Sequence, residues 1–575
     1  MRLPLKHWDI APRVPSEQIE GLPDWPPIIV QLLWNRGVRE LADIAAFFGD
    51  HDEQMHSASL MKGVAPAVAR IRQAIEGDEL VAVYGDFDVD GVTAAAVMRE
   101  ALAALGGQVI PYIPNRAEEG YGVNCAALEH LRSRGVKLVV TVDCGVSAGK
   151  EVGYARELGL DIIITDHHQV TEEVPSAIAV INPRQPECRY PYKELAAVGV
   201  AFKLAQALLD GAGVGKEDRA ELECRLLDLV ALGTVADVAP LLGENRVLVK
   251  RGLAVLNKTQ RPGLKEMIKK AGLRPGNITS GSIGYALGPR LNAAGRLHDA
   301  LASYQLLITR SPEESRQLAE YLNDTNQERQ RLTAEALERA RGDVAAGGHV
   351  PKLLMVSGAE YPAGVVGLVA GRLMEEFYRP VLVLELGDEE SRGSARSIAE
   401  LDITEALSEC QDLLTRFGGH ARAAGFTIPS PRVEQLKQRL LALAESRFEG
   451  IDLQPRLHVD CEVPLWEANW NLQKQLATMA PFGFGNPQPT LLARGVWVAG
   501  AKAVGREGDH LRLRLTDGRV EVDGIAFRMG AAGKEVDKRR VDVVYTLEVN
   551  EWNGMQSLQL NVKDIGRSVY VSSQA

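Results

Sequence analysis

Residues 80–91 read Leu80-Val81-Ala82-Val83-Tyr84-Gly85-Asp86-Phe87-Asp88-Val89-Asp90-Gly91. The first five are apolar or aromatic, which predicts a short buried strand. Acidic residues then follow at every second position, and alternate side chains of an extended segment point the same way. We therefore expect Asp86, Asp88 and Asp90 to converge on one point just beyond the end of this strand.

The residues around this stretch alternate short apolar strands with helical segments. Further strands are predicted at 108–113, 137–142, 161–165 and 177–181, and helices at 92–105, 125–134 and 147–158. This alternation is typical of an α/β fold with a parallel, doubly wound sheet. Ligands of such sheets bind beyond the carboxyl ends of the strands, so chemistry is expected there.

The pattern changes three times after residue 309. Ser311-Pro312-Glu313-Glu314 is a strong helix start, and a charged helical pattern follows it, which predicts a long, solvated connecting helix. A second α/β unit comes next. From about Leu457 the pattern is all-β, with hairpin signals at Asp517-Gly518 and Asn553-Gly554 that predict a compact barrel or sandwich. The predicted division is an N-terminal extension with a lid or packing role at 1–60, a parallel-sheet domain at 61–309, a connecting helix at 310–346, a second α/β domain at 347–450 and a β-barrel at 457–575.

Composition limits the class of protein. A chain of 575 residues is too long for one hydrophobic core. The net charge of −11 weighs mildly against a nucleic-acid binder, although the acidic excess lies before Arg456 and the remainder is nearly neutral. The six cysteines form no Cys-x-x-Cys pair, which argues against a zinc ribbon and a disulfide framework and favours a reducing compartment. With no apparent signal peptide and no bilayer-length apolar run, we expect a cytoplasmic protein without membrane association.

Three more acidic or histidine sites stand at predicted strand ends: Asp143, the run Asp166-His167-His168, and Asp237. Clustered carboxylates repel one another unless cations neutralise them. Hard oxygen ligands with a few imidazoles suit Mn²⁺ or Mg²⁺. Two such ions about 3.5–4 Å apart would hold a bridging hydroxide and neutralise a phosphate. The arrangement predicts a two-metal hydrolase of phosphodiester bonds.

Each site also has a plainer interpretation. Asp-x-Asp-x-Asp-Gly opens a calcium EF-hand loop, but the twelfth position here is Val97 instead of glutamate, and the loop follows a strand. A single aspartate at a strand end is more often a helix cap than a ligand. The joint occurrence of four sites at one edge of one sheet favours metal binding.

Taken together, these motifs resemble the DHH phosphoesterase superfamily. Ile113-Pro114-Asn115-Arg116, Gly120-Tyr121-Gly122 and the run from Gly288 to Arg296 resemble its single-strand-specific exonucleases. Two further runs, Gly393 to Ser397 and Gly418 to Phe426, resemble its DHHA1-type domain. The resemblance covers roughly residues 50–575, so the parallel-sheet domain corresponds to a DHH domain and residues 347–450 to a DHHA1-type domain.

The resemblance implies 5′→3′ hydrolysis of single-stranded DNA to mononucleotides with two Mn²⁺ or Mg²⁺ ions, in DNA repair and recombination. Asp88 and Asp143 would bind one ion with Asp86 close by, and Asp90, Asp143, His167 and Asp237 would bind the other. The implied catalytic residues are Asp143, His168 and Arg290. The implied substrate contacts are Asn115, Arg116, His168, Arg290, Asn292, Arg296, Gly418 and Gly419, with Ser394, Arg396 and His420 receiving the 5′ end.

The chain departs from this pattern at Tyr84, where some DHH relatives have a histidine. Tyrosine is a poor ligand here, so Asp86 is expected to substitute and the first ion to bind more weakly. Arg290 and Arg296 are expected in a Gly/Asn-rich turn that favours anion binding.

The C-terminal barrel resembles an OB fold, which binds single strands through a basic groove and stacked aromatic side chains. Four tryptophans (466, 470, 497 and 552) and four arginines (512, 514, 539 and 540) fall in it. Most of these tryptophans are expected in the core.

Substrate and partners follow from the same resemblance. We expect a monomer that acts on single-stranded DNA with a 5′ end, supplied by a helicase or a single-strand-binding protein, and a channel between the two α/β domains too narrow for a duplex. Two alternatives remain open: a DHH phosphodiesterase for short or cyclic dinucleotides, and a catalytically inactive replication scaffold.

Overall fold

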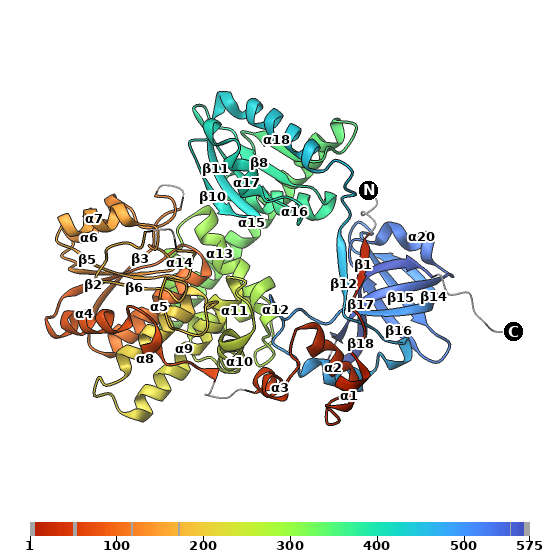
Figure 1. Ribbon diagram of the computed structural model, residues 1–575, viewed down its shortest axis with the longest axis horizontal. Coiled ribbons are helices and arrows are strands. Elements are labelled where there is room, and N and C mark those ends of the chain that lie inside the picture. Colours follow the sequence, from red (N-terminus) through yellow and green to blue (C-terminus); the bar gives the residue numbers. More distant parts are fainter. Residues whose placement is uncertain (1–5, 50–53, 117–118, 171–172, 553, 569–575) are drawn as a thin grey trace. The chain divides into compact units, whose positions relative to one another are not determined.

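The computed structural model describes residues 6–49, 54–116, 119–170, 173–552 and 554–568 (Figure 1). The chain forms two compact units. One contains residues 1–39, 330–480 and 488–575, and the other contains residues 40–329 and 481–487. We call the second the DHH unit, because it carries the Asp-His-His run, and describe each unit by itself. Within the described residues, no helix is both long and apolar enough to cross a membrane.

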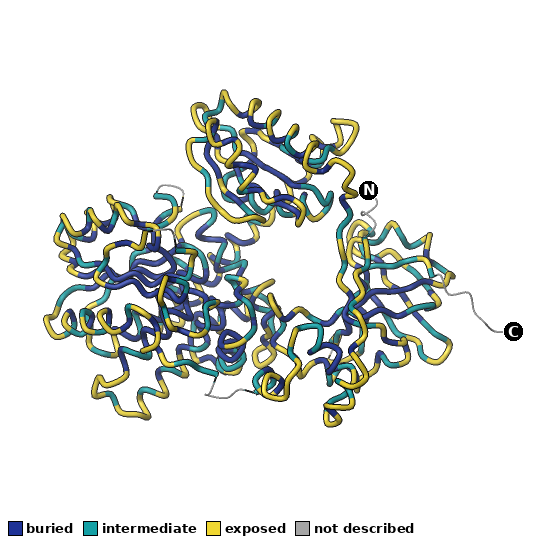
Figure 2. Tube along the Cα trace, in the orientation of Figure 1, coloured by how far each residue is buried: buried dark blue, intermediate teal, exposed yellow. Residues whose placement is uncertain are grey.

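The DHH unit is built on a parallel five-stranded sheet. Its strands are β2 (Leu80–Tyr84), β3 (Gln108–Tyr112), β4 (Leu138–Val142), β5 (Asp161–Thr165) and β6 (Ala179–Ile181), in the order β3-β2-β4-β5-β6. Every neighbouring pair is parallel, as predicted. Figure 2 shows these strands as mostly buried, which explains their nearly continuous apolar sequences.

Helices cover both faces of this sheet. On one face α4 (Val64–Glu76), α5 (Val89–Ala104) and α8 (Ala197–Leu209) share a core, and on the other α6 (Cys125–Ser133) and α7 (Gly149–Glu157) form a second one. Helix α5 begins at Val89 instead of residue 92, because the Asp88 carboxylate caps it by accepting a hydrogen bond from the Gly91 amide at 3.1 Å.

The rest of the DHH unit is helical. It contains α9 (Lys216–Ala236), α10 (Gly243–Leu256), α11 (Pro262–Lys270), α13 (Gly288–Leu297) and α14 (Leu301–Ile308), and a π-helix at Ile283–Leu287 precedes α13. The expectation of a turn at 288–296 was therefore wrong. Pro289 stands in the first turn of α13, where proline favours helix, and Ala293 and Ala294 continue it.

The long helix predicted after Ser311 is confirmed as α15 (Pro312–Ala346), and the Glu314 amide donates to Ser311 Oγ at 3.3 Å. It is not simply solvated. Ala319 and Leu322 belong to the core of the DHH unit, whereas Ala336 and Ala340 belong to a core of the other unit. Both halves bury apolar residues at helical spacing, between charged positions that dominate the composition.

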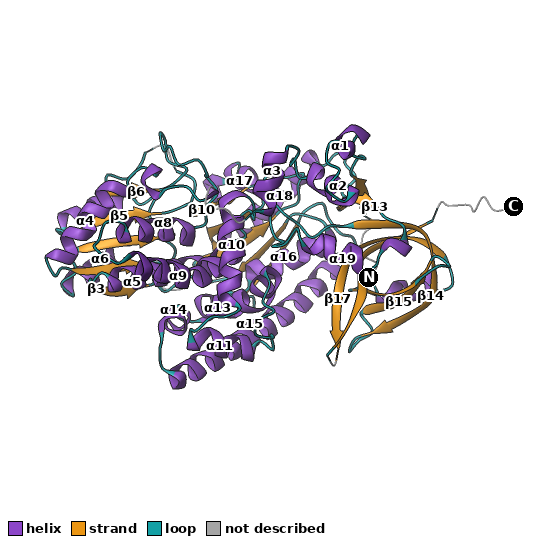
Figure 3. Cartoon of the chain, turned by 90° about the horizontal axis from the view of Figure 1, so that it is seen from below, coloured by secondary structure: helices purple, strands orange, loops and turns teal. Residues whose placement is uncertain are grey.

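The second α/β region has a mixed sheet. Its strands β7 (Leu354–Gly358), β8 (Val381–Glu385), β9 (Glu390–Arg396), β10 (Arg416–His420) and β11 (Ala423–Pro429) have the order β10-β11-β9-β8-β7. Only β7 and β8 pair in parallel. Helices α16 (Val366–Phe377), α17 (Ile403–Ser408) and α18 (Val433–Arg447) pack against it (Figure 3).

The C-terminal region is a closed barrel of β14 (Leu491–Val504), β15 (His510–Thr516), β16 (Glu521–Ala526), β18 (Met555–Arg567) and β17 (Arg540–Trp552), and the β14–β17 pairing closes it. Only β16 and β18 are parallel within this ring. The predicted hairpin at Asp517-Gly518 joins β15 to β16. The second predicted hairpin joins β17 to β18, although Asn553 itself lies outside the described residues.

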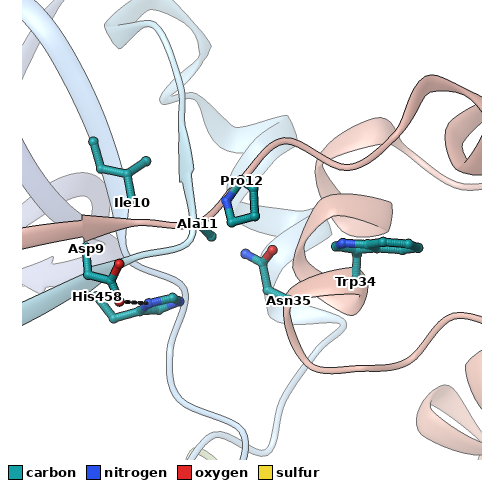
Figure 4. Close-up of a pocket in the computed structure, with 7 residues that line it drawn as sticks. All are labelled: Asp9, Ile10, Ala11, Pro12, Trp34, Asn35 and His458. Carbon is teal, nitrogen blue, oxygen red and sulfur yellow. Dashed lines mark ion pairs between the residues drawn. The ribbon is translucent and has the colours of Figure 1, made fainter.

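The N-terminal residues pack against this barrel region. Strand β1 (His7–Ile10) pairs in parallel with β12 (Arg456–Val459), and the Trp8 indole donates to Asp564 at 2.7 Å. Figure 4 shows the neighbouring pocket, where Asp9 and His458 lie 3.8 Å apart and Asn35 comes from helix α2 (Pro27–Asn35). These contacts support the packing part of the role expected for the N-terminal extension.

Candidate metal centre

Three overlapping groups of carboxylates and imidazoles lie together in the DHH unit. They are Asp86, Asp88 and Asp143; Asp90, His167 and Asp237; and Asp143, His167 and His168. Within each group, one ligand atom per residue lies within 4.8 Å of the others. Every predicted metal ligand is therefore brought into the cluster, and Asp143 and His167 each belong to two groups.

The parallel sheet supplies most of these residues from its carboxyl edge. Asp86 and Asp88 follow β2, Asp143 follows β4, and His167 and His168 follow β5. Asp143 has a φ of 65°, a left-handed conformation that non-glycine residues rarely adopt. Such strain persists only where surrounding structure holds it, and it is concentrated at functional sites.

Asp237 reaches the cluster from a different kind of element than the sequence predicted. It caps the carboxyl end of helix α9 and does not follow a strand. The apolar run before it, residues 226–236, is the last part of this largely buried helix, and periodicity alone does not distinguish such a run from a buried strand.

Asp90 is held by the amino end of another helix. Its two carboxylate oxygens accept hydrogen bonds from the Ala197 amide at 2.7 Å and the Val198 amide at 2.9 Å, at the start of α8. Gly233 of α9 permits this approach, since a Cβ there would lie 2.8 Å from Asp90 Oδ1. Helices α8 and α9 thus fix the buried carboxylate of Asp90, which is a residue of α5.

Asp166 orients the two histidines. Its Oδ1 atom accepts from the His167 amide at 2.8 Å and lies 2.7 Å from His168 Nδ1, while Oδ2 accepts from the Val146 amide at 3.0 Å. Burial alone would lower the pKa of His168, but its hydrogen bond to Asp166 and the negative charge there raise it. Asp166 opens the Asp-His-His motif, but no role was predicted for it from the sequence.

The electrostatics of the cluster favour cations. Burial and then the charge of Asp88 raise the pKa of Asp86, and burial with the neighbouring carboxylates raises that of Asp143. The same causes raise the pKa of Asp90 to about 7 and, with the charge of Asp90, that of Asp237 to about 9. Burial, and then the charge of His168, lowers the pKa of His167 to about 4, which keeps its imidazole neutral for ligation.

Two buried carboxylate oxygens point to the same conclusion. Within the described residues, Oδ1 of Asp86 and Oδ1 of Asp143 accept no hydrogen bond, although His167 Nε2 lies 3.2 Å from the Asp143 oxygen. Buried carboxylate oxygens without donors are rare, and a site for a cation is one of the standard explanations. The donor set of oxygens with neutral imidazole fits Mn²⁺ or Mg²⁺.

Tyr84 is not part of this cluster. Its hydroxyl donates to the Gly122 carbonyl at 2.9 Å, and its ring stacks on Tyr112 with centroids 5.0 Å apart in the core beneath α6 and α7. Asp86 lies with Asp88 and Asp143 instead, as expected for a chain with tyrosine at this position. Weaker binding of the first ion remains a prediction.

Arg116 and Tyr121 lie beside the cluster. The Arg116 guanidinium lies 5.0 Å from the centre of the Phe87 ring; burial lowers its pKa, while the charges of Asp86 and Asp88 act to raise it. The Asn115 amide donates to Glu119 Oε1 at 2.8 Å. Sequence reasoning missed Tyr121, whose hydroxyl lies 3.3 Å from His168 Nδ1. A tyrosine between two glycines was the available sequence signal.

Helix α13 supports the metal-binding loop. Asn292 Oδ1 accepts from the Val89 amide at 2.9 Å, and a Cβ at Gly295 would meet the Phe87 carbonyl oxygen at 2.4 Å. Arg290 donates to the Ala286 carbonyl at 2.9 Å, and Arg296 lies in the last turn. Asn292 therefore has a visible role in holding the loop, and its substrate contact stays a prediction.

The predicted 5′-end residues form one cluster in their own unit. Strand β11 pairs with both β9 and β10, so Ser394, Gly425 and Gly418 form one cross-strand row and Arg396, Ala423 and His420 another. Residues two apart on a strand face the same side, so Ser394, Arg396, Gly418 and His420 share a face. Arg396 Nη1 donates to Ser394 Oγ at 3.0 Å, and Gly419 lies between the rows, opposite Ala424.

The expectation that most barrel-region tryptophans are core was wrong. Trp466, Trp470 and Trp497 are 43%, 41% and 39% exposed, and the side chain of Trp552 lies outside what the structure describes. The Arg519 guanidinium lies 5.8 Å from the centre of the Trp466 ring. Arg512 and Arg514 pair with Asp523 and Glu521 at 3.3 and 3.8 Å. The barrel closes on aliphatic strand residues, which leaves these indoles at its surface.

Fold and site define a DHH-type phosphoesterase with a DHHA1 domain. The models for the DHH family N-terminal domain, the DHHA1 domain and the RecJ OB domain match residues 80–234, 350–450 and 459–564. The chain is 37% identical to the single-stranded-DNA-specific exonuclease RecJ of Bacillus subtilis, over 97% of this chain and 70% of that relative. It is 35% identical to the Escherichia coli RecJ exonuclease, over 94% of this chain and 96% of that one. The chain belongs to the RecJ family.

A solved structure agrees with this assignment. The crystal structure of RecJ from Thermus thermophilus in complex with Mn²⁺ superposes with a TM-score of 0.83 at 29% identity, covering 98% of this chain and 80% of that chain. The same protein has been solved in complex with Mg²⁺, with a TM-score of 0.76. The match extends over DHH, DHHA1 and barrel regions together.

Proposed function

We propose that this chain is a two-metal-ion exonuclease that hydrolyses single-stranded DNA in the 5′→3′ direction and releases 5′-mononucleotides. The observation that carries the proposal is the convergence of six ligand residues, Asp86, Asp88, Asp90, Asp143, His167 and Asp237, in a chain that belongs to the RecJ family along nearly its whole length. The inactive-scaffold alternative predicts a broken cluster, and this cluster is complete.

In this proposal Asp86, Asp88 and Asp143 hold one divalent cation, and Asp90, Asp143, His167 and Asp237 hold the other. Asp143 is the shared ligand, in keeping with its place in two of the three groups. When bound, two Mn²⁺ or Mg²⁺ ions neutralise the scissile phosphate and lower the pKa of the attacking water. No side-chain nucleophile is required, and Cys144 is a buried core residue.

The chain's own residues orient the substrate and move protons. Arg116 and Arg290 bind phosphate oxygens, which develop charge in the transition state. The Nδ1 atom of His168 is committed to Asp166, and its side chain is 46% exposed, so the imidazole is positioned to contact the phosphate or to give a proton to the leaving oxygen. Tyr121 lies beside this imidazole and limits its rotation.

In this proposal the DHHA1 region determines the 5′→3′ polarity of hydrolysis along the DNA strand. Ser394, Arg396 and His420, with the backbone of Gly418 and Gly419, would receive the terminal 5′-phosphate. Asn292 and Arg296 of α13 and Asn115 would contact the strand near the scissile bond. The exposed tryptophans and arginines of the barrel would bind the following nucleotides by stacking and charge.

The cellular role proposed from the family is processing of unwound DNA in repair and recombination, with a helicase or single-strand-binding protein as supplier and the enzyme acting as a monomer. The decisive test is digestion of one oligonucleotide labelled at either end, with Mn²⁺, Mg²⁺ or a chelator. We expect labelled mononucleotide to appear at once from the 5′-labelled strand and only late from the 3′-labelled one, with no product in chelator. Early release of mononucleotide from the 3′-labelled strand would contradict the proposed polarity. Digestion in the presence of chelator would contradict the metal mechanism.

A further inference from the structure

Helix α9 ends in a strained turn directly after the metal ligand Asp237. The Val238 amide donates to the Val235 carbonyl and the Ala239 amide to the Thr234 carbonyl, each at 3.2 Å. This is a Schellman motif, whose residue after the cap takes a left-handed conformation and is usually glycine. Here it is Val238, with a φ of 60° and a side chain 63% exposed. A β-branched residue in this conformation is a genuine outlier.

A segment distant in sequence braces this turn. Residues 481–487, Pro481-Phe482-Gly483-Phe484-Gly485-Asn486-Pro487, belong to the DHH unit although both flanking stretches belong to the other unit. We call them the strap. The Leu241 amide, three residues beyond Val238, donates to the Phe484 carbonyl at 2.7 Å. A strained conformation persists when its surroundings over-determine it, and the strap supplies such a restraint.

The strap is itself firmly anchored. Its Pro481 and Phe482 carbonyls accept from Arg246 Nη1 at 3.3 Å and Ser280 Oγ at 2.6 Å. Asn486 is fully buried and donates from Nδ2 to the Pro481 carbonyl at 2.9 Å, which closes the strap into a tight turn. Three strap carbonyls thus meet three separate segments of the DHH unit.

Two strap glycines fit against the turn. A Cβ at Gly483 would lie 2.7 Å from Leu241 Cδ1, and one at Gly485 would lie 3.3 Å from Pro240 Cβ. Gly485 also has a φ of 76°. Tyr192 holds the same segment, because its hydroxyl donates to the Leu242 carbonyl at 2.9 Å. The residues after Asp237 are therefore held by both Tyr192 and the strap.

We propose that the strap is a positioning element for Asp237: it holds the strained end of α9 in the conformation that presents this carboxylate to the metal centre. The inference rests on the proposed function in one respect, the assignment of Asp237 as a metal ligand. None of the strap residues belongs to the three groups of metal-ligating side chains, so the strap acts through the turn. The strap also lies within residues 459–564, which match the RecJ OB domain, so that region contributes to the metal centre as well as to DNA binding.

The test measures Mn²⁺ binding to the full-length protein by calorimetry, without DNA. Gly483→Val pushes Leu241 away from the strap, and Asn486→Ala loosens the strap with a smaller disturbance of the core. Each is expected to weaken one of the two Mn²⁺ sites about tenfold, the scale found when residues that orient metal ligands are changed. Gly153→Val is the matched control, because Gly153 lies on the exposed side of α7 with no atom near its Cβ position.

A second substitution separates positioning from general stability. Val238→Gly removes the strain that the strap opposes, so the double variant Gly483→Val/Val238→Gly should recover wild-type Mn²⁺ affinity to within about twofold, a non-additive result expected only of coupled residues. If the strap contributed only to general stability, Gly483→Val would lower Mn²⁺ affinity equally with and without Val238→Gly.

The variant Asp237→Ala distinguishes failure of the strap proposal from failure of the proposed function. If Asp237→Ala leaves Mn²⁺ binding unchanged, the ligand assignment in the proposed function is wrong. If Asp237→Ala weakens one site while Gly483→Val and Asn486→Ala both bind Mn²⁺ like the wild type, only the role of the strap is overturned. Should Gly483→Val fail to fold, Asn486→Ala with and without Val238→Gly carries the same comparison.

Discussion

His168 Nδ1 lies 2.7 Å from Oδ1 of Asp166, and the same carboxylate also accepts the amides of His167 and Val146. Asp166 therefore fixes the loop after β5 and sets the orientation and charge of one imidazole at the same time. A carboxylate behind a histidine of this kind stabilises the protonated ring.

Asp166→Asn should lower the pKa of His168, because the negative charge that raises it is removed. If protonated His168 serves the leaving oxygen, the fall of kcat on the alkaline side moves to lower pH, and kcat at neutral pH drops by up to the factor of about 10²–10⁴ that a general acid contributes. The measurement is a pH profile of kcat on a 5′-labelled oligonucleotide. His168→Ala provides the reference, and an Asp166→Asn profile that keeps its alkaline limb in place contradicts the coupling.

Replacing Asp143 and replacing Asp237 should have different effects on metal binding. Asp143 belongs to two ligand groups and Asp237 to one, so Asp143→Ala is expected to abolish binding of both ions and Asp237→Ala of one. Turnover should fall by about 10²–10³-fold or more for Asp143→Ala, the scale of losing a preorganised electrostatic contact, while affinity for single-stranded DNA stays near wild type. Calorimetry with Mn²⁺ gives the number of sites. Two intact sites in Asp143→Ala would show that it is not shared.

Metal affinity should rise with pH. The pKa of Asp90 is about 7 and that of Asp237 about 9, so protons compete with the ions at neutral pH and are released when the ions bind. Calorimetry at pH 7 in buffers of different ionisation enthalpy counts these protons directly. Release of no protons at pH 7 would contradict the raised pKa values.

The same shifts predict how the metal-free protein responds to pH. Because the folded-state pKa values of Asp90 and Asp237 lie above their ordinary value of 3.8, the folded state binds more protons than the unfolded state between about pH 4 and these values. Stability without metal therefore falls as pH rises through that window, and Mn²⁺ should reverse the fall. Melting temperatures between pH 5 and 9, with Mn²⁺ or chelator, test both signs.

The sequence allowed the sheet to be predicted well, because strands such as Asp161–Thr165 are short apolar runs between clear helices and turns. The ligands on its strand ends followed directly from that. Asp237 was placed on the wrong kind of element, since a buried helix and a buried strand share an apolar composition. The bond from the Val89 amide to Asn292 and the strap against Leu241 join residues more than 200 positions apart, and no local pattern encodes such pairs.

A buried charge network is expected to matter for stability. Arg261 donates to Asp228 at 3.0 Å and also pairs with Glu100, which ties α5 to α9. Arg261→Met should cost about 3–5 kcal/mol in the free energy of unfolding, because it leaves the buried Asp228 carboxylate without its guanidinium and leaves the half-buried Glu100 with Arg225 as its remaining partner. Denaturant unfolding at fixed Mn²⁺ measures the loss. The triple variant with Asp228→Asn and Glu100→Gln removes those charges and should recover part of it; no recovery would mean that packing, not charge, is responsible.

Substitution of the exposed indoles of the barrel region tests DNA-strand binding separately from hydrolysis. Trp466 is partly exposed with Arg519 above its ring, an arrangement on which a base can stack. Trp466→Ala should weaken binding of long single-stranded oligonucleotides by about 1–3 kcal/mol, whereas Trp466→Phe, which keeps an aromatic face, should lose much less. Turnover of oligonucleotides too short to reach the barrel should be the same for both variants, because the metal ligands are untouched. Fluorescence anisotropy at fixed salt gives the affinities, since phosphate contacts make them salt-dependent. Equal affinities for the alanine and phenylalanine variants would remove stacking at Trp466 from the account and leave the arginines as the source of binding.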